Sequence, residues 1–164
     1  MKAIVLAGIA IAVLAPAVLF TTSAASQSIV QIASSDPQFS TLVTALKAAD
    51  LLKTLEGSGP FTVFAPTNAA FAKIKKTSLD ALLKNKVLLT RVLTYHVVSG
   101  TVMASDVLKM NGKVAKSLEG SDLRIHVKGA AVRINRSNVT QTDIISSNGV
   151  IHVIDRVLIP TMKK

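Results

Sequence analysis

The sequence predicts an α+β domain in which helices come first along the chain and strands follow. In the first half, apolar residues recur at intervals of three and four, which is the spacing of a single buried helix face. After Gly100 the apolar period becomes two, as in strands that bury one side. No internal repeat and no low-complexity linker divides the chain, so we expect a single domain over residues 26–164.

The N-terminal segment, residues 1–25, has the pattern of a secretory signal peptide. Lys2 precedes an uncharged apolar run that ends at Phe20, and the small residues up to Ala25 form a cleavage signature. An uncleaved membrane anchor is the alternative, but Pro16 and the lack of a charged stop after the run argue against it. We therefore expect a secreted or periplasmic protein, associated with the cell surface, that has no stable membrane span after cleavage.

The first predicted helix follows a short apolar stretch over residues 28–34. Asp36 can cap the helix, and Pro37 suits its first turn. The helical spacing continues until Gly57-Ser58-Gly59-Pro60 stops it. Its apolar positions are Phe39, Leu42, Val43, Leu46, Ala49, Leu52 and Leu55.

A buried strand is predicted next, over residues 61–65, because this run is short, apolar and rich in β-forming residues. Thr67-Asn68 can cap a short helix that continues through Ile74. A further helical run begins at Ser78 and leads to Tyr95-His96.

The last third of the chain is predicted to be strands. Apolar and polar residues alternate over residues 123–128 and again over 132–135, and Gly129-Ala130 stands where a hairpin turn would lie. Asn148-Gly149 is a second hairpin signal. The nearly continuous apolar run over residues 150–159 then predicts a central, mostly buried strand.

Composition narrows the classes of partner. The 164 residues include 19 Lys or Arg against 9 Asp or Glu, a net charge of +10 that cleavage after Ala25 would lower to +9 because only Lys2 is lost. This charge favours anionic partners. We do not expect nucleic acid as a partner, because the chain has too few aromatic residues for a base-stacking platform: five Phe, one Tyr and no Trp. Without cysteine, the core must hold by packing alone.

Three segments resemble the signature blocks of the fasciclin, or FAS1, family. Residues 59–71, which read GPFTVFAPTNAAF, are similar to its first block, and Tyr95-His96-Val97-Val98-Ser99-Gly100 to its central Tyr-His motif. Residues 148–160, which read NGVIHVIDRVLIP, resemble its C-terminal block, and Asp143-Ile144 stands where the family carries an Asp-Ile dipeptide. The match runs over residues 28–160 and is closest to the small secreted bacterial members.

The resemblance implies a β-sandwich or wedge of about seven strands with a helical cluster packed beside it. It also implies a secreted adhesion module without catalysis, whose partner is a cell-surface or matrix protein or an anionic polysaccharide. Partner recognition in animal members, through integrins, would fall on Tyr95, His96, Asp143 and Ile144, although a bacterial host has no integrin of its own. The alternative interpretation of Tyr95 and His96, which we favour, is a core pair whose polar tips bond to the backbone. The other motif positions are interpreted as structural: Thr67, Asn68, Phe71, Asn148, Gly149, His152 and Asp155.

Catalytic and cofactor sites are not predicted. The three histidines lie in unrelated elements without metal-ligand spacing, and the carboxylates form no local pair that could act as acid and base. No GxSxG elbow, P-loop or GxGxxG motif occurs. We therefore expect a non-enzymatic protein that has no cofactor and no metal.

Two clusters of basic residues are candidate binding surfaces. Arg124, His126 and Lys128 share the non-core face of one predicted strand, and Arg133 and Asn135 are expected beside them on the next, with Arg136 at its end. The second cluster belongs to the helical half and comprises Lys73, Lys75, Lys76, Lys84, Lys86 and Arg91. Each could instead be a solvated face. Weak, salt-sensitive contacts to anionic glycans are the expectation for the two together.

A carrier of an apolar small ligand, such as a carotenoid, is the alternative function, since some family members bind such pigments. It requires an open apolar groove beside the sheet. Two consecutive glycosylation sequons, at Asn135 and Asn138, also fit the sequence.

Overall fold

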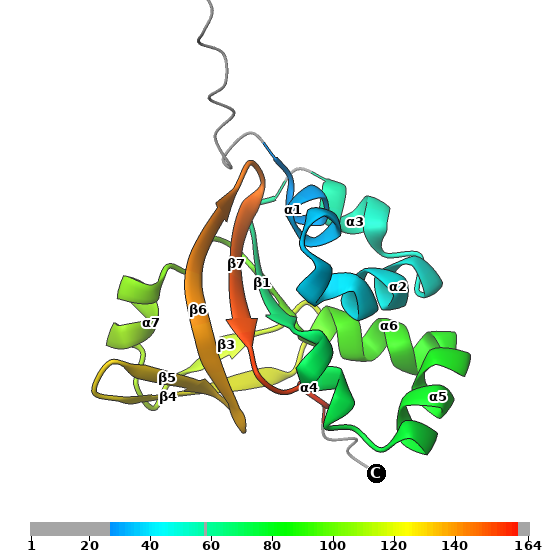
Figure 1. Ribbon diagram of the computed structural model, residues 1–164. Coiled ribbons are helices and arrows are strands. Elements are labelled where there is room, and N and C mark those ends of the chain that lie inside the picture. The colour runs from blue at the N-terminus through cyan, green and yellow to red at the C-terminus, as the bar shows by residue number, and fades with distance from the viewer. Residues whose placement is uncertain (1–26, 58, 161–164) are drawn as a thin grey trace, which may run out of the picture.

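A curved β-sheet and a group of helices beside it make up the fold (Figure 1). The structure is a computed structural model that describes residues 27–57 and 59–160, so the predicted signal segment lies outside the described residues. Within these ranges the strands are β1 (Phe61–Pro66), β2 (Val97–Ser99), β3 (Val114–Lys116), β4 (Asp122–Lys128), β5 (Ala131–Ile134), β6 (Ser137–Ser146) and β7 (Gly149–Ile154). The helices are α1 (Ile29–Ser35), the 3₁₀ turn η4 (Pro37–Phe39), α2 (Ser40–Ala48), α3 (Leu52–Glu56), α4 (Asn68–Ala72), α5 (Lys76–Lys84), α6 (Lys86–Tyr95) and α7 (Ala104–Lys109).

The centre of the sheet joins distant parts of the chain. β1 pairs in parallel with β7 and antiparallel with β2, and the full order is β2-β1-β7-β6-β5-β4-β3. The predicted α+β class and the seven strands are confirmed. The buried C-terminal strand was also predicted correctly as a central one, because β7 lies between β1 and β6.

The two ends of the sheet meet, so the sheet curls towards a barrel. Val98 of β2 forms an isolated antiparallel bridge with Ser117, just after β3. Leu118 donates its backbone N–H to the carbonyl oxygen of Val97 over 2.7 Å. These contacts cover backbone groups that would otherwise be left open at two strand edges.

Two apolar cores lie on opposite sides of β1 and β7. Helices α1 to α6 gather on one side of these strands (Figure 1), where Phe39, Leu89 and Ile151 belong to one buried cluster, which we call the helix-side core. Phe64 and Ile154 belong to the second cluster, inside the curl of β4 and β5. Because both faces of β7 are covered, its sequence is almost continuously apolar.

The helical half contains more breaks than the sequence indicated. The stretch interpreted as apolar, residues 28–34, is the N-cap Ser28 followed by most of α1, which a capping box between Ser28 and Gln31 begins. The predicted helix from Asp36 is divided into η4, α2 and α3, and the left-handed backbone of Asp50, with φ 61°, separates α2 from α3. The run from Ser78 is also divided, because Asn85 is extended and caps α6 through Leu88.

The last strand is shorter than predicted. β7 ends at Ile154 rather than Ile159, since Asp155 accepts the backbone N–H of Asn138 over 2.8 Å and the chain then leaves the sheet. Residues 155–160 return towards α6, where Leu158 becomes buried. This return forms one wall of the candidate site.

Candidate functional site

His96 of the Tyr-His motif is a buried structural residue, 2% exposed at the end of α6. Its Nδ1 lies 2.7 Å from the carbonyl oxygen of Val92, and its Nε2 accepts the backbone N–H of Leu158 over 2.8 Å. The imidazole is therefore neutral, with its proton on Nδ1. Burial lowers the pKa of His96 to about 4, and the bond to Val92 only partly opposes this.

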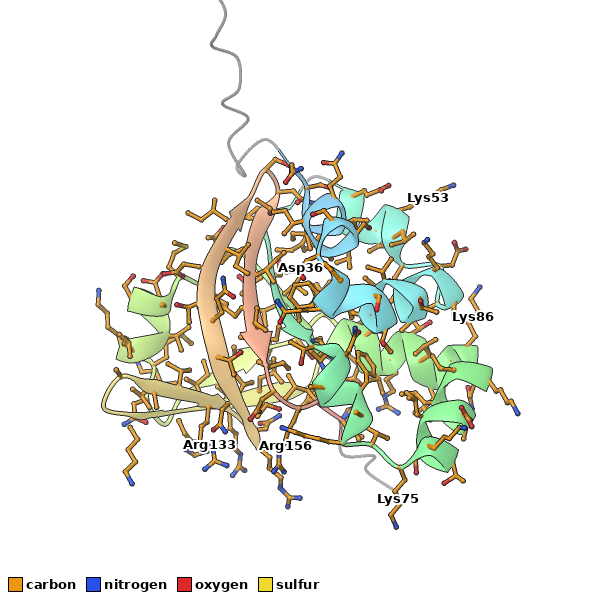
Figure 2. All side chains as sticks on the ribbon, in the orientation of Figure 1. Asp36, Lys53, Lys75, Lys86, Arg133 and Arg156 are labelled. Carbon is orange, nitrogen blue, oxygen red and sulfur yellow. The ribbon has the colours of Figure 1, made fainter. Side chains whose placement is uncertain are left out.

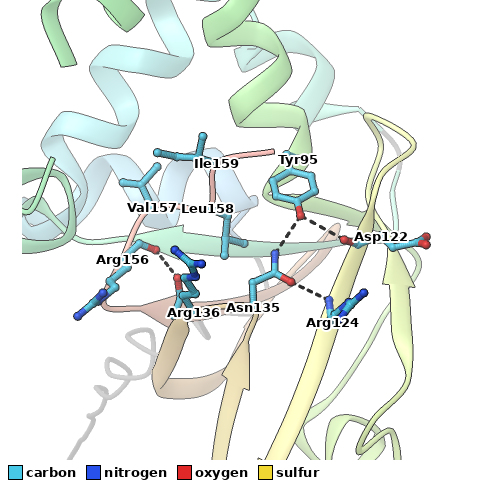
Figure 3. A pocket seen from close by; sticks show the side chains of 10 residues that line it. Tyr95, Asp122, Arg124, Asn135, Arg136, Arg156, Val157, Leu158 and Ile159 are labelled. Atoms are coloured by element: carbon cyan, nitrogen blue, oxygen red, sulfur yellow. Dashed lines mark hydrogen bonds between the residues drawn. The ribbon is translucent and has the colours of Figure 1, made fainter. Parts of the chain in front are cut away.

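Tyr95 is also buried, but its hydroxyl lies at the floor of a surface hollow. The hydroxyl donates to the carbonyl oxygen of Asp122 over 3.1 Å and accepts from Nδ2 of Asn135 over 2.9 Å (Figure 3). Burial raises the pKa of Tyr95, as do the charges of Glu119 and Asp122, while the Asn135 bond lowers it. The phenol is thus neutral at physiological pH and ties α6 to β4 and to the end of β5.

The hollow has a volume of about 560 Å³ and is walled by β4, the turn between β5 and β6, and the returning C-terminal segment. Figure 3 shows Arg124 on one side of Asn135 and Arg136 with Arg156 on the other. The lining residues are Tyr95, Asp122, Arg124, Asn135, Arg136, Ser137, Arg156, Val157, Leu158 and Ile159. We call it the Tyr95 hollow.

The predicted basic hairpin lies beside this hollow. Arg124, His126 and Lys128 are exposed on β4, and His126 pairs directly with Arg133 of β5. Asn135 was wrongly placed on this face. Its backbone is left-handed, with φ 55°, so its side chain turns inward to Tyr95 and accepts the backbone N–H of Arg124 over 2.9 Å.

Two residues of the basic cluster predicted in the helical half, Arg91 and Lys73, bond to other parts of the protein. Arg91 pairs with Glu119, with 2.6 Å between Nε and Oε1, and so belongs to an ion pair. Lys73 donates to the carbonyl oxygen of Asp155 over 2.8 Å. Because Asp155 directly precedes Arg156, this bond joins the helical cluster to the returning C-terminal segment. Figure 2 shows Arg133, Arg156 and Lys75 at the same end of the molecule. We call Arg124, Lys128, Arg133, Arg136 and Arg156 the basic end.

The Asp-Ile dipeptide contacts other segments. Asp143 accepts the backbone N–H of Ala104 at the start of α7 over 2.8 Å, and Ile144 is half-buried against the helix-side core. His152 supports the same region from β7: its Nε2 lies 2.7 Å from the carbonyl oxygen of Val102, and burial lowers its pKa. These contacts are separate from those of Tyr95 and His96, which involve α6, β4, β5 and Leu158.

The comparisons with known proteins agree with this geometry. A family model described as the fasciclin domain matches residues 37–160. The chain belongs to the fasciclin family. It is 48% identical over 139 residues to Protein sll1483 of Synechocystis sp., covering 84% of this chain and 76% of that protein. It is 36% identical over 133 residues to Immunogenic protein MPT70 of Mycobacterium tuberculosis, covering 78% of this chain and 66% of that one.

The fasciclin fold is also found among solved structures. A FAS1 domain pair from the insect cell adhesion molecule Fasciclin I matches 82% of this chain and 51% of that chain. The TM-score is 0.66 at 22% sequence identity, so this likeness concerns the fold.

The first fasciclin block joins helices to β1. Thr67 caps α4 by accepting the backbone N–H of Ala70 over 3.3 Å, and Phe71 is buried in the helix-side core. Asn68 does not bond to its own turn but to a segment 27 to 31 positions earlier in the chain. Its Oδ1 accepts the backbone N–H of Thr41 over 3.0 Å, and its Nδ2 donates to the carbonyl oxygen of Pro37 over 2.9 Å. Asn68 thereby holds the η4–α2 junction against α4.

Asn68→Ala should lower the free energy of unfolding by about 2 kcal/mol, because bonds to two backbone groups are lost at a partly exposed site. Urea denaturation of the purified protein measures the effect. Asn68→Asp, which keeps the acceptor for Thr41 but not the donor to Pro37, should cost about half as much. An unchanged midpoint in Asn68→Ala, with binding lost, would instead assign Asn68 to partner recognition.

The C-terminal fasciclin block joins β7 to the rest of the fold. Asn148 contacts α1 and the end of α3, and a Cβ added at Gly149 would overlap the carbonyl oxygen of Phe61. Asp155 accepts both the backbone N–H and Nδ2 of Asn138. Burial alone would raise the pKa of Asp155, but these bonds and the nearby charges of Lys73 and Arg156 lower it.

A metal site and an apolar ligand site are the other kinds of site that the described part of the fasciclin domain could offer. There, no three His, Asp or Glu side chains come close enough to hold a metal ion. The apolar space between the helices and the sheet, beside Leu42, Leu93 and Ile151, has a volume of about 10 Å³, so an apolar ligand would need the helices to part. Among residues 27–57 and 59–160, no helix has the length and apolar character needed to cross a membrane.

Proposed function

We propose that this chain is a secreted, non-enzymatic adhesion module that binds anionic polymers of the cell surface or extracellular matrix. The observation that carries the proposal is the basic end, which places five cationic side chains from β4, β5 and the returning C-terminal segment on one surface. Such a surface attracts polyanions through many weak contacts.

The charge of this surface is largely uncompensated. The two ion pairs within the described residues use Lys73 and Arg91, and neither belongs to the basic end. Asp122 is the single carboxylate among the residues that line the Tyr95 hollow. A polyanion approaching this surface therefore meets mainly positive charge.

Membership of the fasciclin family supports an adhesion role, because a solved relative is described as a cell adhesion molecule. The polar groups of the family motifs support the absence of catalysis. His96, His152 and Asp143 are committed to backbone hydrogen bonds that hold the fold together. The N-terminal signal pattern supports secretion.

Sedimentation of the purified protein with polysaccharides from its host's envelope, across a salt series, tests the proposal. We expect binding that weakens steeply as salt rises and is lost when Arg124, Lys128 and Arg133 are changed to Glu. The matched control reverses the same number of exposed charges elsewhere, at Lys47, Lys53 and Lys109, and should bind more strongly than the first variant. No sedimentation of the folded wild type at low salt would refute the proposal.

A further inference from the structure

The arginines of the chain are distributed unevenly. There are five, and three of them, Arg124, Arg136 and Arg156, line the Tyr95 hollow, whereas no lysine lines it. Arg133 lies next to the hollow on β5, and Arg91 is used by Glu119. Solubility alone gives no reason to concentrate arginine at one place in a chain rich in lysine. A guanidinium differs from an ammonium in binding a planar oxyanion through two parallel hydrogen bonds.

The three guanidinium groups are available to a ligand. All three residues are exposed, and none belongs to an ion pair of the described residues. Two of the three backbones are held by side chains, because Arg124 donates its N–H to Asn135 and the carbonyl oxygen of Arg156 accepts the Ser137 hydroxyl over 2.9 Å. The polar floor is also fixed through Tyr95. The hollow is therefore largely preorganised for binding.

The remaining wall of the hollow is apolar. Val157 and Leu158 lie there, and Ile159 is 62% exposed. An isolated phosphate or sulfate would leave this wall unused. A sugar ring that carries a carboxylate has both an apolar face of C–H groups and a planar anionic edge, and a volume of about 560 Å³ lies in the range of ligand sites.

We infer that the Tyr95 hollow binds a hexuronate unit of a carboxylated polysaccharide, with the carboxylate on the arginines and the ring against Val157 and Ile159. This inference rests on the proposed function and specifies its ligand. The surrounding basic end then binds neighbouring units of the same polymer by charge alone, while the hollow selects the carboxylated sugar.

Binding of oligogalacturonate to the purified protein tests this inference by calorimetry. The matched ligand is the same oligosaccharide with its carboxylates methyl-esterified, which should bind at least about tenfold more weakly. In amide NMR spectra, the acidic form should shift the signals of Leu158, Ile159 and the Asn135 side chain. Shifts confined to Lys128 and Arg133 would place the ligand outside the hollow and overturn the inference.

A charge-preserving variant separates the hollow from general electrostatics. Arg136→Lys combined with Arg156→Lys keeps the net charge but removes the bidentate geometry, so affinity for oligogalacturonate should fall about tenfold. Arg133→Lys, on the adjacent strand, is the control and should change the affinity less than about twofold. Both variants replace exposed side chains, so the melting temperature should be unchanged.

The remaining outcomes distinguish the inference from the proposed function. If the wild type binds no polyanion at low salt, the proposed function fails and the inference falls with it. If dextran sulfate and oligogalacturonate bind equally, and the double lysine variant binds both as well as the wild type does, only the inference fails. Tighter binding of polyglutamate than of oligogalacturonate would overturn the inference in favour of an acidic protein partner.

Discussion

Replacing Asn148 with alanine should lower the free energy of unfolding by about 3 kcal/mol, a large fraction of the roughly 5–15 kcal/mol that stabilises a typical domain. Oδ1 of Asn148 accepts the backbone N–H of Ile29 over 3.0 Å, and its Nδ2 donates to the carbonyl oxygens of Leu55 and Gly57. One side chain thus connects α1, the end of α3 and the β6–β7 turn. Its removal leaves three backbone groups without their partner at a half-buried site.

Urea denaturation at neutral pH measures this effect. Asn111→Ala is the matched control, because Asn111 is exposed and accepts a single backbone N–H, that of Val127, over 2.9 Å. It should cost no more than about 1 kcal/mol. Equal losses in the two variants would mean that Asn148 does not connect the three segments energetically.

Acidification should destabilise the protein between pH 6.5 and pH 4 because His96 is held neutral. The pKa of His96 is about 4 in the fold and about 6.5 in an unfolded chain, so the unfolded state binds more protons in this window. Stability from this group is fully present above pH 6.5 and is lost as pH falls towards 4. The full loss amounts to about 3 kcal/mol.

Urea midpoints measured from pH 4 to pH 7 give this dependence, and His96→Gln should flatten it. The burial-lowered pKa of His152 contributes a further loss in the same direction. His126→Gln is the control: His126 is exposed on β4, so the slope should stay as in the wild type. An NMR titration in which the folded His96 ring titrates near pH 6.5 would contradict the assignment.

Local patterns of the sequence predicted several elements well. The strand at residues 61–65, the helix that ends at Tyr95 and the strands around Gly129 are confirmed by β1, α6, β4 and β5. In each of them the apolar period or the local turn chemistry agrees with the tertiary structure.

Other elements gave no clear pattern. β6 shows no clear alternation of apolar residues, because register shifts interrupt its pairing with β7 around Gln141 and Asp143 has a left-handed φ of 57°. The short elements β2, β3 and α7 contain too few residues to establish a period. The break at Asp50 also depends on a backbone conformation that aspartate adopts only in context.

The sequence predicted the part of the candidate site on β4 but not the wall formed by the C-terminal segment. The alternation around Arg124 and Lys128 predicted an exposed basic face, but Arg156 was placed inside a continuous strand and Ile159 at its end. Their arrival beside Tyr95 depends on the end of β7 at Ile154 and on the bond from Leu158 to His96. The uneven use of arginine was the signal in the sequence that could have indicated the hollow.

The parallel pairing of β1 with β7 also determines when this protein can fold. The strand that begins at Phe61 lacks its partner until the segment from Gly149 to Ile154 has been synthesised, and Asn148 adds a contact to Ile29 across 119 positions of sequence. Contacts of such long range make folding slow, because the chain entropy of closing the loop is lost before the pairing is gained. The centre of the sheet therefore forms only after residues 149–154 have been synthesised, so that completion of the last strand comes before folding of the domain.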